Sequence, residues 1–88
     1  MNTNIFEAIQ NGDLDEIEYF FDQGGDVNIE DEFGDSLLEN AYQFDQMGAF
    51  ELLRDKGADV KYFILKNNYE IKQKIYKYKY LEELINKI

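Results

Sequence analysis

Acidic side chains are the residues of this chain whose spacing could do chemistry, and calcium binding is the first chemistry to test. Oxygen-bearing side chains alternate along one stretch as the first ligands of a calcium loop do: Asp26, Asn28, Glu30 and Glu32. That loop needs a glycine at its sixth position and a glutamate at its twelfth, but this chain has Asp31 and Leu37 there. The pattern therefore predicts a solvated acidic loop and no metal site.

Catalytic arrangements that depend on histidine or cysteine are excluded by composition. The 88 residues contain no His and no Cys, which removes nucleophile–base pairs, histidine acid–base chemistry and the usual zinc sites. Ser36 is the only serine and Thr3 the only threonine, and helix capping accounts for both. With 19 acidic residues, chance proximity of two carboxylates carries little information. We therefore expect no enzyme activity and no cofactor.

Charge is divided unevenly along the chain. Residues 1–60 hold 16 acids and two bases, a net charge of −14, whereas residues 61–88 hold seven Lys and three Glu, a net charge of +4. An acidic body attracts basic proteins and repels nucleic acid and membrane surfaces. The Tyr–Lys alternation at 76–80 could stack on bases, but the tract is short. We expect no nucleic-acid or membrane partner and, with no signal peptide apparent, a cytoplasmic location.

One phrase occurs twice, 33 residues apart: residues 22–27 read Asp-Gln-Gly-Gly-Asp-Val, and residues 55–60 read Asp-Lys-Gly-Ala-Asp-Val. Apolar positions with helical spacing precede each copy: Ile5, Ala8 and Ile9, then Leu14, Ile17, Phe20 and Phe21 in the first; Leu37, Leu38, Ala41 and Tyr42, then Met47, Phe50, Leu52 and Leu53 in the second. Thr3 or Asn4 can cap the first helix. The unit is a short helix, a turn, a longer helix ended by glycine, and an extended finger at 26–36. A period of this length is typical of stacked repeats.

These residues resemble the ankyrin repeat, most closely in the second copy. The positions that carry the resemblance are Asp31, Gly34, Ser36, Leu38, Ala41, Leu52, Leu53 and residues 57–60 in the second copy, and Thr3, Ala8, Asn11, Gly12, Leu14, Ile17 and residues 24–28 in the first. Leu37 and Glu39 depart from the family's Pro and His, and Asp45 stands where the first copy has Gly12. The resemblance implies an all-α, ankyrin-like stack of antiparallel helix pairs with an extended β-turn finger.

The implied organisation is one domain over residues 1–88. Repeat 1 covers about 3–29, repeat 2 about 30–61, and a degenerate capping repeat covers 62–88. Residues 62–65 predict a third short helix, whereas residues 75–81 fit either a helix joint or a strand, with the joint preferred because the flanks are helical.

In the ankyrin family, partners dock on the finger tips and on the concave face of the first helices. Carried over, this implies a protein-binding surface made of Glu30, Glu32, Phe33, Asp35, Gln43, Phe44, Gln10 and Asn11. Phe33 and Phe44 occupy positions that the family leaves variable and exposed, so an aromatic pair rimmed by carboxylates would suit a basic, partly apolar partner. The alternative is that the two rings pack on each other or on the C-terminal cap.

Two functions remain open for this surface. One is a non-catalytic protein–protein interaction module, monomeric or weakly self-associating, that binds a basic or partly apolar protein. The other is an inhibitor of the immunity or antitoxin type that covers the active site of a basic enzyme, which the small size and the charge of −10 would fit.

Overall fold

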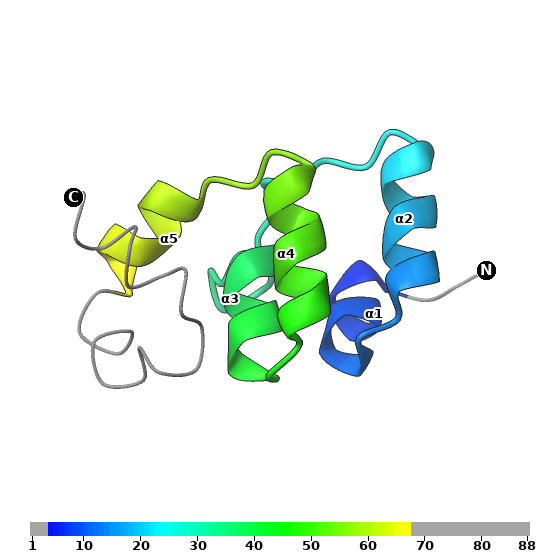
Figure 1. Ribbon diagram of the computed structural model, residues 1–88. Coiled ribbons are helices and arrows are strands. Elements are labelled where there is room, and N and C mark those ends of the chain that lie inside the picture. The colour runs from blue at the N-terminus through cyan, green and yellow to red at the C-terminus, as the bar shows by residue number, and fades with distance from the viewer. Residues whose placement is uncertain (1–3, 68–88) are drawn as a thin grey trace. The chain divides into compact units, whose positions relative to one another are not determined.

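The computed structural model describes residues 4–67, which form five α-helices (Figure 1). They are α1 (Ile5–Asn11), α2 (Leu14–Asp22), α3 (Leu37–Gln43), α4 (Met47–Asp55) and α5 (Val60–Lys66). Within these residues the only extended pairing is an isolated antiparallel bridge between Glu30 and Ser36. For residues 4–67, the prediction of an all-α protein is confirmed. The chain divides after Ala58 into two units, of which the first contains α1 to α4.

The first unit consists of two helix pairs with the same local plan. In each pair a seven-residue helix leads through a short turn into a nine-residue helix that packs against it. The pairs then meet helix to helix, α1 against α3 and α2 against α4 (Figure 1). The helix bounds therefore agree with the apolar spacing and with the turn and glycine signals of the sequence.

The turn inside each pair requires a residue in the left-handed region. Gly12 has φ 69° after α1, and Asp45 has φ 60° after α3, where it is the only non-glycine residue with positive φ among those described. The backbone bonds also correspond, because Asp13 donates to the Ala8 carbonyl and Gln46 to the Ala41 carbonyl, at 2.9 and 2.8 Å. The second copy thus makes the glycine turn of the first with an aspartate, as the sequence predicted.

The core of the first unit lies between the four helices. Its largest side chains with less than 2% exposure are Ile9, Ile17, Leu37, Leu38, Phe50 and Leu53. Ile17 and Phe50 are equivalent under the 33-residue shift and both are fully buried. Removing such side chains from water is the main force that holds helices this short, because isolated helices of seven to nine residues are unstable in water.

The loop from 26 to 36 is an extended finger with a tight tip, as predicted. Asp31 fixes that tip: its carboxylate accepts hydrogen bonds from the backbone N–H groups of Phe33 and Asp35, both at 2.9 Å. Gly34 has φ 82° and donates to the Asp31 carbonyl. Ser36 then begins α3 with a capping box, in which its side chain and that of Glu39 each accept a backbone N–H of the other residue.

The second unit is described only as far as residue 67. Its α5 confirms the predicted third short helix, begins with Asp59 as a side-chain cap and buries Phe63 and Ile64. The rest of the predicted capping repeat, including residues 75–81, lies outside the described residues. Every helix within residues 4–67 is too short and too polar to cross a membrane.

Candidate protein-binding surface

A hollow of about 670 Å³ lies between the finger tip and the first helix. One wall is formed by Asn4, Phe6, Glu7 and Gln10, and the other by residues 30–33 of the finger. It therefore brings together four of the residues expected at a binding surface: Gln10, Glu30, Glu32 and Phe33. We call it the finger hollow.

Phe33 is the most exposed large apolar side chain among the described residues. Its exposed fraction is 80%, and it stands at a tip whose backbone Asp31 holds by hydrogen bonds. Glu30 and Glu32 beside it are also exposed, whereas Asp35 is half-buried. The Asp35 N–H donates to the Asp31 carboxylate, and the Asp31 N–H donates to the Asp35 carbonyl. A large apolar ring is thus presented to solvent between carboxylates on a well-defined turn.

A chain of side-chain hydrogen bonds links the two walls of the hollow. Gln10 on α1 donates to Asn40 at 3.0 Å, and Asn40 donates to the Asp31 carboxylate at 3.1 Å and to the Ser36 carbonyl at 3.0 Å. Asn40 is only 3% exposed, so these are bonds in a largely water-free place, where a lost partner is costly. The hollow therefore has walls whose spacing is fixed before any ligand arrives.

The remaining candidates lie elsewhere. Gln43 is exposed in the last turn of α3, and Phe44 follows it as the C-cap with an exposed fraction of 48%. The finger joins α3 at its other end, at Ser36, and a seven-residue helix is about 10 Å long. Phe33 and Phe44 make no ring contact with each other. Asn11 is exposed at the end of α1.

The basic residues of the first unit lie away from the finger. Lys56 pairs with Glu18 at 3.0 Å, which ties the end of α4 to α2, and Arg54 pairs with its neighbour Asp55 at 3.2 Å. The residues that line the finger hollow include four carboxylates and no base. The field around Phe33 is therefore negative, which favours a cationic ligand.

Four residues that line the hollow were not among the predicted binding residues: Asn4, Phe6, Glu7 and Asp31. Asn4 had been expected only as a helix cap, and it does accept the Phe6 N–H at 2.8 Å. Phe6 could not be recognised as a site residue from the sequence, because only the packing of the finger beside α1 makes it line the same hollow as Phe33. A signal for it does exist, since the 33-residue shift aligns Phe6 with Glu39, so the two copies differ strongly there.

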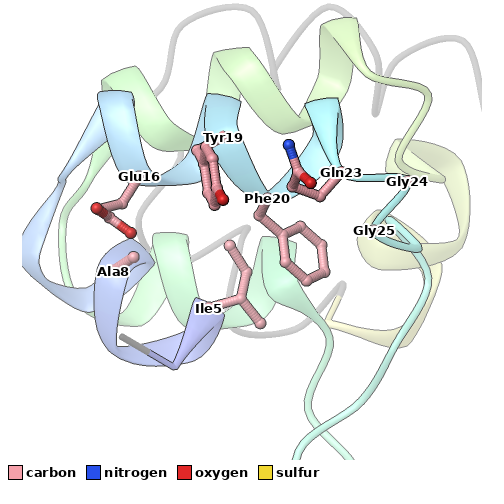
Figure 2. A pocket seen from close by; sticks show the side chains of 8 residues that line it. All are labelled: Ile5, Ala8, Glu16, Tyr19, Phe20, Gln23, Gly24 and Gly25. Carbon is pink, nitrogen blue, oxygen red and sulfur yellow. The ribbon is translucent and has the colours of Figure 1, made fainter. Parts of the chain in front are cut away.

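A second hollow, of about 310 Å³, lies between α1 and α2 (Figure 2). Figure 2 shows Ile5, Tyr19 and Phe20 directed toward it, with Glu16 and Gln23 at its border. A Cβ at Gly25 would overlap the Phe20 ring, so a larger residue there would displace that ring. None of the predicted binding residues lines this hollow, and we call it the helix hollow.

Neither a model of a known protein family, nor a curated protein, nor a solved structure matches this chain.

Proposed function

We propose that this chain is a non-catalytic protein-binding module that takes a basic, partly apolar protein on its finger and on the adjoining face of α1. The observation that carries the proposal is Phe33, 80% exposed on a turn fixed by Asp31. Burying such a ring is worth about 1.5–3 kcal/mol, which folding leaves unused and a partner can gain. Aromatic side chains are enriched where proteins bind each other.

The proposal includes an ankyrin-like stack of the helix pairs. Two features support it besides the repeated phrase: positive φ recurs 33 residues apart, at Gly12 and Asp45 and again at Gly24 and Gly57. The pairs also meet through equivalent helices, α1 with α3 and α2 with α4. In such a stack the fingers and the short helices share one face, which is the face that carries the finger hollow.

The acidic residues around Phe33 indicate that the partner carries a positive charge. The exposed carboxylates of Glu30 and Glu32 flank Phe33, and the net charge of the whole chain is −10. A basic partner would be drawn to this face by long-range attraction and held there by the ring. The same field disfavours nucleic acid, whose phosphates it would repel.

The first test is capture of a partner by the wild-type chain and by Phe33→Ala, compared by quantitative mass spectrometry. A partner retained by the wild type and lost by the variant would support the proposal. Proteins captured equally by both would count against it, since a hot-spot ring contributes more than about 1 kcal/mol.

The second test uses the captured partner in titrations with single variants. We expect Phe33→Ala to weaken binding by more than about 1 kcal/mol, and Phe44→Ala to do so for a partner long enough to follow α3. Glu32→Lys and Asp35→Lys should mainly slow association, and the effect should shrink as salt shortens the Debye length from about 8 Å.

Asp15→Lys is the matched control for these charge reversals, because Asp15 is exposed on α2, away from the finger hollow. Glu18 is a poorer control, since reversing it would also break its ion pair with Lys56. If Asp15→Lys slowed association more than Glu32→Lys, the binding face would have to be reassigned to the longer helices.

A further inference from the structure

From the finger hollow we infer that the partner inserts an arginine side chain there, against Phe6 and Phe33. This inference rests on the proposed protein-binding function and adds the chemistry of the group that is recognised. Phe6 and Phe33 come from opposite walls of the hollow, one from α1 and one from the finger. A cationic group that enters between the walls can therefore meet an aromatic ring and a carboxylate together.

The carboxylates of the hollow divide into two roles. Asp31 holds the tip, because it accepts hydrogen bonds from Phe33, Asp35 and Asn40. Glu7, Glu30 and Glu32 are exposed around the opening, so their oxygens can accept hydrogen bonds from a ligand. No base lies among the lining residues to compete for them. The charge of the hollow is thus complementary to a cation.

Arginine fits these surroundings better than lysine. A guanidinium group is planar, stacks on aromatic rings and donates several hydrogen bonds in a fixed fork, whereas an ammonium group is a strongly hydrated point charge. A hollow of about 670 Å³ is within the range of ligand sites and has room for the residues that flank the arginine. Because the Gln10–Asn40–Asp31 hydrogen bonds already fix both walls, little ordering is required on binding.

The test is an NMR titration of the ¹⁵N-labelled full chain with acetyl-Gly-Arg-Gly-amide. The same peptide with citrulline, which keeps the shape and removes the charge, is the first control, and the peptide with lysine is the second. We expect saturable shifts of the backbone amides of 6–10 and 30–34 with arginine, weaker shifts with lysine, and none with citrulline. Phe33→Ala should weaken the arginine peptide about two- to fivefold, as expected for an exposed cation–π contact.

Tyr19→Ala is the matched variant, because it also removes an exposed aromatic ring but lies outside the finger hollow. Its affinity for the peptide should equal that of the wild type. Equal shifts with citrulline or lysine, shifts spread over α2, or none at 6–10 and 30–34 would overturn the inference. The peptide titration does not use the protein partner, so the two proposals can fail separately. If the arginine peptide does not bind, a partner whose capture depends on Phe33 would still support the protein-binding function. If no such partner is captured, the titration would still show whether the finger hollow binds arginine.

Discussion

The two helix pairs of the first unit share a backbone plan, but the second pair buries seven apolar side chains and the first buries four. In the first pair, residues 5–22, the helix hollow leaves Ile5, Tyr19 and Phe20 in contact with an open space (Figure 2). Tyr19 is 53% exposed and its equivalent Leu52 is half-buried, whereas Phe20 is half-buried and its equivalent Leu53 is fully buried. The repeat therefore fixes the turns and helix lengths, whereas the burial of equivalent side chains differs between the two copies.

The pairs also differ in how their longer helices begin. Asp13 caps α2 through a hydrogen bond from the Glu16 N–H at 3.2 Å. Its equivalent, Gln46, makes no cap for α4 and instead donates from its side chain to the Gln10 carbonyl at 2.9 Å, which links the two pairs. The second pair has exchanged a local hydrogen bond for one between the pairs.

The largest expected effect tests whether the core is centred on the second pair. Phe50→Ala should lower the free energy of unfolding by about 3–5 kcal/mol, because it empties a fully buried position. Urea unfolding followed by circular dichroism measures it, and Phe50→Leu provides a milder change if the alanine variant does not fold. Phe33→Ala is the matched control, expected within about 0.5 kcal/mol of the wild type because that ring is exposed. Similar losses for both phenylalanines would contradict the assigned core.

The next effect concerns the hydrogen bonds that join the pairs to the finger. Asn40→Ala should cost about 1–3 kcal/mol, since it strips Gln10, Asp31 and the Ser36 carbonyl of a partner in a buried place. The same urea titration measures it. Gln43→Ala, at an exposed position of the same helix, should change stability by less than about 0.5 kcal/mol. Equal values would mean that the buried amide is not what fixes the finger.

Gln46 allows the two ways of starting a helix to be compared directly. Gln46→Ala should cost about 1 kcal/mol, the usual worth of one hydrogen bond. Gln46→Asp loses the same bond but gains a cap like that of Asp13, also worth about 1 kcal/mol, so its stability should lie near that of the wild type. Thermal unfolding separates the two variants. An aspartate variant as unstable as the alanine variant would show that the bond between the pairs has no local substitute.

Local signals in the sequence were enough for the helices and turns. Gly12, Gly24 and Gly57 have positive φ, Ser36 forms a cap, and even the left-handed Asp45 could be placed by its alignment with Gly12. These features depend on a few neighbouring residues, so a single sequence contains them.

The lining of the finger hollow could be predicted only in part, because it depends on contacts between distant residues. Glu30, Glu32 and Phe33 were predicted and do line the hollow, whereas Phe6 was not predicted. The expected pairing of Phe33 with Phe44 ignored the length of α3 between them. Gln10 was expected to face a partner, and although it lines the hollow, its side-chain amide is bonded to Asn40, 30 residues away. Such bonds follow from tertiary packing, which no local pattern specifies.

The smallest expected effect is the stability change caused by Asp45→Gly. Its sign tests whether the turn at Asp45 is equivalent to the turn at Gly12. Asp45 has φ 60°, a conformation that costs an aspartate about 1 kcal/mol relative to glycine. Glycine would relieve this strain but would also increase the conformational entropy of the unfolded chain, which offsets part of the stabilisation. Asp45→Gly should therefore stabilise the protein by about 0.5 kcal/mol, which raises the melting temperature by about 2–4 °C for a domain of this size. Gly12→Ala is the reciprocal variant and should destabilise the protein. Alanine is strained at the positive φ of this position, and its Cβ would overlap the Gln46 side-chain amide. A lower melting temperature for Asp45→Gly would mean that the aspartate stabilises its turn by more than its strain costs, and the two turns would then be equivalent in shape alone.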